Sequence, residues 1–308
     1  MDSSYPFSNP TSLALLSRSA PWMRFLLLLL LVTLGLTSTG QAFEGTVRPS
    51  ALAGAWYPGD PDRLRTAVDG MLDSAKPAPI QGTIRALIVP HAGYAYSGPT
   101  AASAFDLVRG RAYDRVLILA PSHHRGFAGL SVAAVDAFET PLGQVPLDLD
   151  AINRLRLSSL FSDEPQAHEQ EHAIEIELPL LQRALQPGWR LVPVLVGQLA
   201  PRDYQNAAAL LRSLADEKTL VVVSSDFTHY GPRFGYQPFP QDAQLSERLR
   251  TLDQGAIDRI QAGDGPGLLD YQERTGITVC GVRPLALFLG MLPADARVQL
   301  VAYKTSGA

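Results

Sequence analysis

The sequence of 308 residues lacks most of the features that would assign a function from composition alone. It has a single cysteine, Cys280, so no internal disulfide can form, and this residue is either a small buried side chain or a chemically useful thiol. Outside the N-terminal residues there is no lysine- or arginine-rich cluster, and the net charge is -4. A nucleic-acid partner is therefore not expected, since binding one requires a basic face. The glycine-rich loops that bind nucleotide phosphates are also missing.

The one extended hydrophobic run lies near the N-terminus. Arg18 and Arg24 precede the leucine-rich stretch 25–36, and a small, polar stretch follows it and ends at Ala42. This order of a basic, a hydrophobic and a small-residue segment is typical of a cleaved signal peptide. The run is about a dozen residues long, whereas a membrane span needs about twenty. We therefore interpret residues 1–42 as a signal peptide and expect the protein to be exported.

Two alternatives remain open for this segment. It could stay uncleaved as an N-terminal anchor, which would be the only membrane contact that the sequence predicts. Met23 could also be the true start, because Met-Arg followed by the leucine run already makes a compact signal.

Beyond this segment, short apolar runs alternate with stretches of helical periodicity. The expected strands are 84–89, 116–120, 129–135, 191–196, 220–223 and 298–302. The expected helices begin at Pro61, capped by Asp60, and cover 99–108, 174–185, 203–214, 241–261 and 280–292. Alternation of this kind, with strands that are apolar throughout, is typical of a mostly parallel sheet covered by helices on both faces. The hydrophobic fraction of 46% is ordinary for a folded protein with a sizeable core. Together with the pattern of strands and helices, it predicts a single three-layer α/β domain over residues 43–308.

The six histidines are distributed unevenly. His91 follows one expected strand, His123 and His124 follow the next, and His229 follows the strand 220–223 together with Asp226. Ligands of open α/β sheets bind at the carboxyl ends of the strands, and imidazole is both the commonest metal ligand and the usual acid/base near neutral pH. Two such histidines with a carboxylate or thiolate would form an open site of the non-haem iron type. A single histidine would more simply cap a turn, but four at strand ends favour a site.

A second motif competes with this interpretation. Residues 168–172 match the H-E-x-x-H pattern of zinc proteases, which requires His168 and His172 on one face of a packed helix. Here Pro165 interrupts a polar stretch, and the apolar periodicity begins only at Ile174. We therefore interpret the motif as an exposed, polar helix start.

Cys280 lies beside Gly281 at an expected boundary between a strand and a helix. At such a position a thiolate ligand or nucleophile is favoured by the helix N-terminus. The alternative is a small buried side chain, and the residues alone leave both interpretations open.

Several motifs, taken in order along the chain, resemble the Memo family, whose prokaryotic members are called AmmeMemoRadiSam system protein B. These motifs are Gly54-Ala-Trp-Tyr-Pro58, Pro90-His-Ala-Gly-Tyr94, Pro121-Ser-His-His124, Glu171-His-Ala-Ile-Glu175, Pro193-Val-Leu-Val-Gly197, Ser224-Ser-Asp-Phe-Thr-His229 and Cys280-Gly281. The resemblance implies a fold similar to the catalytic subunits of class III extradiol dioxygenases, which cleave catechol rings with non-haem iron.

The resemblance also implies roles for individual residues. His91 and His123 match the two histidine ligands of the family, and Cys280 matches the third ligand, where the ring-cleaving enzymes have a glutamate. Asp226 and His229 match the remaining polar residues of the pocket, with His229 as acid/base. His124 and His172 would be supporting residues, whereas His168 lies outside the family motif.

The implied function is redox or oxygenase-like chemistry at iron or copper, less so zinc, on a small substrate that the sequence does not identify. A thiolate in place of a carboxylate suits a softer metal and argues against catechol cleavage in particular. The alternative is a non-enzymatic protein that binds a ligand or peptide in the same pocket, with Trp56 and Tyr94 as aromatic walls. Members of the family are mostly cytosolic, so the expected export signal is a departure from it.

Overall fold

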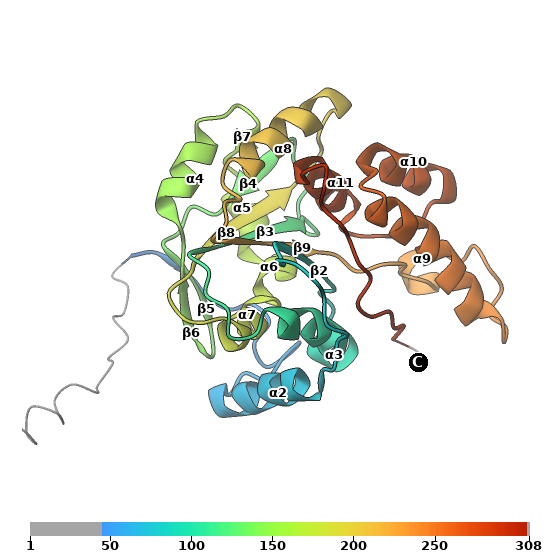
Figure 1. Cartoon of the computed structure of the whole chain (residues 1–308), viewed down its shortest axis with the longest axis horizontal. Coiled ribbons are helices and arrows are strands. Elements are labelled where there is room, and N and C mark those ends of the chain that lie inside the picture. Colours follow the sequence, from blue (N-terminus) through green and yellow to red (C-terminus); the bar gives the residue numbers. More distant parts are fainter. Residues whose placement is uncertain (1–44, 307–308) are drawn as a thin grey trace, which may run out of the picture. The chain divides into compact units, whose positions relative to one another are not determined.

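The computed structural model of the protein describes residues 45–306, which lie within one unit, Phe43–Ala308 (Figure 1). The expected signal segment 1–42 lies outside the described residues. Among the residues that are described, no helix is long and apolar enough to cross a membrane.

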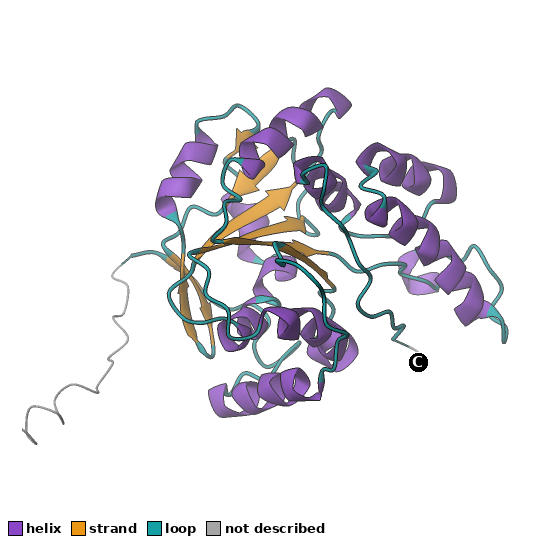
Figure 2. Ribbon diagram, viewed as in Figure 1, coloured by secondary structure: helices purple, strands orange, loops and turns teal. Residues whose placement is uncertain are grey.

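The larger sheet of the described residues has the strand order β2-β9-β3-β8-β4-β7 (Figure 2). Its strands are β2 (Ala86–Val89), β9 (Thr219–Ser224), β3 (Arg115–Pro121), β8 (Arg190–Val196), β4 (Leu130–Val132) and β7 (Phe161–Ser162). From β2 to β8 all neighbours are parallel, β4 is antiparallel to β8, and β7 is parallel to β4. The prediction of a mostly parallel sheet is therefore confirmed.

Helices cover both faces of this sheet. The four on one face are α2 (Pro61–Ser74), α3 (Tyr94–Phe105), α6 (His172–Glu175) and α7 (Leu178–Ala184). The opposite face carries α8 (Tyr204–Arg212) and α11 (Val282–Met291), with α10 (Gly265–Thr275) and α9 (Leu245–Gln261) beyond them (Figure 1). Because both faces are covered, nearly every side chain of β3, β8 and β9 is buried, which explains their continuous apolar sequences. The three-layer prediction is confirmed.

The remaining elements are short and are set by tertiary contacts. They are β1 (Val47–Arg48), β5 (Ala137–Thr140), β6 (Gly143–Pro146), α4 (Leu149–Arg156), α5 (Pro165–Glu169) and three 3-10 turns at Asp106–Val108, Pro201–Asp203 and Pro232–Phe234. Strands β1, β5 and β6 form a second sheet of their own. None of these strands was predicted, because runs of two to four residues carry too little periodicity.

Helix α2 starts as its sequence predicts. The side chain of Asp60 accepts a hydrogen bond from the Arg63 N–H at 2.9 Å, and Pro61 occupies the first turn. The buried residues Leu64, Val68 and Leu72 face the core.

Several predicted elements differ from the structure. Helix α3 begins at Tyr94 instead of Pro99, because the N–H groups of Tyr96 and Ser97 already donate to the carbonyl of Gly93. The helix expected over 174–185 is interrupted between α6 and α7, where Pro179 begins a new turn. Residues 298–302 form no strand within the described range; the Val298 carbonyl accepts from the Gln261 side chain of α9, and the neighbouring Tyr303 donates to Asp253 of the same helix.

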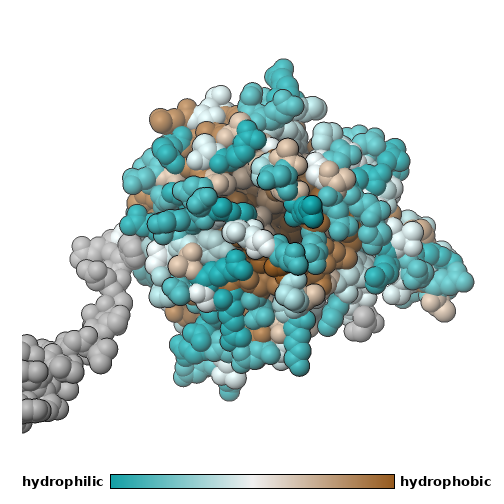
Figure 3. Space-filling model, viewed as in Figure 1, coloured by the Kyte–Doolittle hydropathy of each residue, from teal (hydrophilic) through white to brown (hydrophobic). Residues whose placement is uncertain are grey.

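One face of the molecule is hollowed near its middle (Figure 3). Hydrophobic residues line part of the hollow and hydrophilic residues surround it.

Candidate metal centre

The carboxyl ends of neighbouring parallel strands bring the predicted site residues together. Strand β9 lies between β2 and β3, and its register pairs Ser224 with Val89 of β2. His91 and Asp226 follow this pair, and the His91 N–H donates to Oδ1 of Asp226 at 2.9 Å. His123 follows the end of β3 on the other side of β9. The strand order therefore places these three residues at one edge of the sheet, as predicted.

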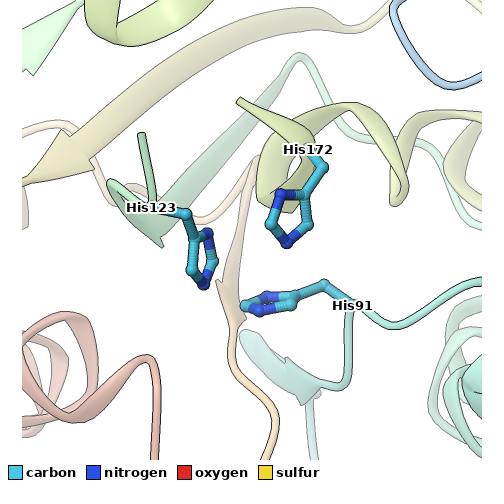
Figure 4. A group of neighbouring side chains, drawn as sticks. All are labelled: His91, His123 and His172. Atoms are coloured by element: carbon cyan, nitrogen blue, oxygen red, sulfur yellow. The ribbon is translucent and has the colours of Figure 1, made fainter. Parts of the chain in front are cut away.

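His91, His123 and His172 form a compact cluster of imidazole rings (Figure 4). The ring centroids are 5.1 Å apart for His91 and His123, 4.2 Å for His123 and His172, and 5.3 Å for His91 and His172. A nitrogen of each ring lies within 4.8 Å of a nitrogen of the other two. The rings point toward a shared space between them (Figure 4). His172, predicted as a supporting residue, is thus placed where a ligand would be.

Glu171 orients two rings of this cluster. Its Oε1 lies 2.8 Å from Nδ1 of His123 and 3.4 Å from Nδ1 of His172, and its Oε2 accepts from the His123 N–H at 2.6 Å. A Nδ1–H that donates to a carboxylate leaves Nε2 with the lone pair that a metal needs. Glu171 also caps α6 by accepting from the Ala173 N–H. Glu171 was not predicted as a site residue, although it stands directly before His172 in the sequence.

The surroundings keep two of these imidazoles, those of His91 and His172, neutral. Burial, together with the nearby His123, lowers the pKa of His91 to about 3 and that of His172 to about 4. Burial alone would raise the pKa of Glu171, but hydrogen bonds from His123 and from backbone N–H groups lower it to about 2. At neutral pH His91 and His172 are therefore neutral imidazoles near an ionised carboxylate, and a neutral imidazole is the form that binds metal ions.

A second group of donors shares His91. The Cys280 sulfur lies 3.1 Å from Nε2 of His91 and accepts from the Asp226 N–H at 3.1 Å. Oδ2 of Asp226 lies 4.0 Å from the same imidazole nitrogen. Burial, with the neighbouring Asp226 charge, raises the pKa of the Cys280 thiol to about 12, so the metal-free thiol is protonated.

Close packing at Gly281 brings Cys280 to this position. Gly281 N–H donates to Oγ of Ser225 at 3.0 Å, and a Cβ at residue 281 would overlap the Ser225 side chain. Residues 276–279 form a loop, so the predicted strand before Cys280 is wrong and the boundary is one between a loop and α11.

His229 lies close to the same carboxylate oxygen of Asp226 as His91 does. Its Nδ1 faces the carbonyl of Thr278 at 3.1 Å, which fixes the proton on Nδ1. Its Nε2 then faces Oδ2 of Asp226 at 3.8 Å. Burial raises the pKa of Asp226, although backbone hydrogen bonds act against this. An imidazole with a free nitrogen beside such a carboxyl group is suited to accept or donate a proton.

Two exposed aromatic rings flank the cluster. Trp56 is 38% exposed and its ring lies 4.7 Å from that of His172. Phe234, which the sequence analysis did not single out, is 50% exposed and lies 5.1 Å from the ring of His229. Tyr94 was expected beside Trp56 as a wall of the pocket, but it is buried and its hydroxyl donates to the Ile176 carbonyl at 2.9 Å.

The two other histidines belong to neither donor group. His124 is exposed, with its ring 6.0 Å from that of His172. His168 is only 4% exposed, and its Nε2 lies 3.2 Å from Oγ of Ser131. The prediction of an exposed helix start is therefore wrong for His168. Because His168 lies on α5 and His172 on α6, the two do not share a face of one helix as a zinc-protease motif requires.

Comparison with known proteins identifies the family. A family model described as Memo-like protein matches residues 48–308. The chain belongs to the Memo family. It is 33% identical over 288 residues to a memo-1 homolog of Caenorhabditis elegans, covering 92% of this chain and 81% of the relative. A MEMO1 family protein of Methanopyrus kandleri is 32% identical over 279 residues, with 84% and 92% covered. Protein MEMO1 of Homo sapiens is 32% identical over 251 residues, with 80% and 84% covered.

The donors of this Memo protein fit a transition-metal ion. Imidazole nitrogens, a sulfur and a carboxylate oxygen converge within 4.8 Å in two overlapping groups. Sulfur and nitrogen ligands select iron, copper or zinc over the oxygen-preferring Mg²⁺ and Ca²⁺. The residues therefore form a candidate metal centre of mixed nitrogen, sulfur and oxygen character.

Proposed function

We propose that this Memo-family protein is a metal-dependent oxidoreductase that holds iron or copper through His91, His123 and Cys280 and acts on a small substrate. The observation that carries the proposal is the arrangement at the carboxyl edge of the sheet. There Nε2 of His91 faces the Cys280 sulfur at 3.1 Å, and the His123 ring lies 5.1 Å from that of His91. A thiolate with two imidazoles suits iron, copper or zinc and leaves coordination positions open, and of these metals iron and copper carry out redox chemistry.

The protein's residues divide the work at this site. Bound iron or copper would supply open positions and one-electron chemistry. Cys280 gives up its proton to become a ligand, since the thiolate is the binding form. His229, held by Thr278, presents Nε2 on the side of Asp226 and moves a proton to or from the substrate. Glu171 fixes the orientation of the His123 ring through its hydrogen bond with Nδ1.

Elemental analysis tests this proposal directly. The full chain, purified anaerobically without chelators, is expected to carry iron or copper, and His91→Ala and His123→Ala to lose it. His124→Ala is the matched control, because His124 is an exposed histidine of the same loop that lies in neither donor group. Zinc alone would contradict redox chemistry while keeping the metal site.

The exposed rings of Trp56 and Phe234 favour a second candidate, a protein that binds a ligand or peptide without turnover. The same experiment separates the two. Protein without bound metal, with metal affinity unchanged in His91→Ala and His123→Ala, would contradict the metal proposal and leave binding as the remaining function.

A further inference from the structure

A buried hydrogen-bond chain lies behind His91, on the side away from the cluster. Nδ1 of His91 lies 2.7 Å from Oγ of Ser224, the last residue of β9, which is fully buried. The same hydroxyl lies 2.6 Å from the Ala173 carbonyl and 3.1 Å from Oε1 of Glu177. Three groups from two segments of the chain therefore meet at one hydroxyl oxygen.

The proton count at Ser224 fixes the tautomer of His91. A hydroxyl has one proton, and the Ala173 carbonyl at 2.6 Å can only accept it. The Ser224 oxygen then accepts from the Nδ1–H of His91. Nε2 of His91 is consequently unprotonated and directs its lone pair toward Cys280 and the imidazole cluster.

Glu177 completes the arrangement as a neutral acid. Its side chain is 1% exposed, and within the described residues its Oε2 has no hydrogen-bond partner. An ionised carboxylate is costly in such a place, and burial raises the pKa of Glu177 well above its usual range. A proton on Oε1 lets the acid donate to the Ser224 oxygen at 3.1 Å. The Ser224 hydroxyl then donates one hydrogen bond and accepts two.

We propose that Glu177, acting as a hydrogen-bond donor through Ser224, is a positioning residue that fixes the Nδ1–H tautomer and the orientation of His91 for metal binding. This assignment rests on the proposed function, because it takes His91 as a ligand. His91 and His123 are then oriented in different ways. The ionised carboxylate of Glu171 orients His123 directly, whereas the neutral acid Glu177 orients His91 through the Ser224 hydroxyl.

Metal affinity of three variants tests the role of each group. Co²⁺ is titrated into the metal-free full chain in competition with a chromophoric chelator. Glu177→Gln is expected to keep the affinity within about twofold, because the amide N–H still donates to Ser224. Glu177→Leu and Ser224→Ala are expected to weaken it by about 10- to 100-fold, the usual effect of losing an outer-shell partner. A Gln variant as weak as the Leu variant, or an unaffected Ser224→Ala, would overturn the proposal.

The tautomer can be read without any metal. In ¹⁵N NMR spectra of the metal-free protein, the His91 ring is expected to carry its proton on Nδ1, in the wild type and in Glu177→Gln. A proton on Nε2 would overturn the inference even in a protein that binds Co²⁺ tightly. Conversely, a wild type that binds no Co²⁺ but shows the Nδ1–H tautomer would contradict the proposed function and leave the positioning chain standing.

Discussion

Two glutamates near the cluster have opposite protonation states because their hydrogen-bond partners differ. Glu171 accepts from the His123 ring and from the N–H groups of His123 and Ala173, so its charge is compensated. Glu177 has one hydroxyl as a partner and an oxygen that no described residue bonds. Burial therefore favours the neutral form of Glu177, while the N–H donors hold Glu171 ionised.

Glu171 is expected to stabilise the fold in a pH-dependent way. Its pKa falls from 4.5 to about 2 on folding, so its contribution is present above about pH 4.5 and is lost as the pH falls toward 2. Glu171→Gln should reduce the free energy of unfolding by about 3 kcal/mol at pH 7 and by less at pH 3.5, where the wild type has lost part of this contribution. Urea unfolding at both pH values measures this. An equal loss at both would contradict the ionised role of Glu171.

Cys280 is expected to make metal affinity depend on pH. Since the pKa of the metal-free thiol is about 12, its proton must leave on binding at any physiological pH. The affinity for Co²⁺ should then rise about tenfold per pH unit between pH 6 and 8. His91 and His172, with pKa values of about 3 and 4, add no slope in this range. Cys280→Ala should flatten the dependence; an unchanged slope would remove Cys280 from the ligands.

At the scale of elements, Arg48 joins β1 to the helices behind the cluster. Its guanidinium lies 2.7 Å from Oε2 of Glu175 and donates to the carbonyls of His168 and Glu171. Both partners of the ion pair are buried, with side-chain exposures of 5% and 0%. Removing Arg48 leaves the buried Glu175 carboxylate without its counter-ion, although the N–H groups of Ala51 and Leu52 still donate to it.

Arg48→Met is therefore expected to lower the free energy of unfolding by about 3–5 kcal/mol, measured by urea denaturation. The matched control is Arg65→Met, because Arg65 forms an ion pair of similar length with Asp62 on the surface of α2. Exposed pairs contribute little, so the control should change stability by less than about 1 kcal/mol. Similar losses in both variants would contradict a larger contribution of the buried Arg48–Glu175 pair to stability.

The elements that the sequence predicts well are those whose apolar pattern is complete. Strands β3, β8 and β9 are buried on both faces and read as apolar runs, and α2 has a cap and a regular apolar spacing. The expected strand over 298–302 fails because an apolar run does not reveal its partner, which here is a helix. Strand β1 is fixed by its pairing with β5, which local sequence does not encode.

The residues of the site also differ in whether the sequence predicts them. His91 and His123 could be found because they follow recognisable strands. Ser224 and Thr278 act only through contacts with residues distant in sequence, and the His172 ring enters the cluster because Glu171 begins a new helix there. The hydrogen-bond partners of a site thus escape prediction even where residues that follow strands can be singled out.

At the scale of the whole molecule, the parallel order of the strands determines where the candidate site lies. Because β2, β9 and β3 are neighbours and parallel, their carboxyl ends deliver His91, Asp226 and His123 to one edge, which crossover helices leave open. The single cysteine lies at this edge, where its sulfur is 3.1 Å from Nε2 of His91. Because the sequence has no second cysteine, an oxidising compartment cannot introduce an internal disulfide into this protein.

We propose that the protein is exported and that residues 1–42 are removed. The segment has the features of a cleaved signal peptide. Arg18 and Arg24 precede a short leucine-rich run, and the small residues Gly40 and Ala42 stand before the expected cut. Expression of the full chain in a bacterial host should yield an exported protein whose first residue is Phe43, as read by N-terminal sequencing and intact mass. Ala42→Leu should block cleavage, because a signal peptidase requires a small residue before the cut. Wild-type protein that keeps the segment and sediments with membranes would instead show an anchor.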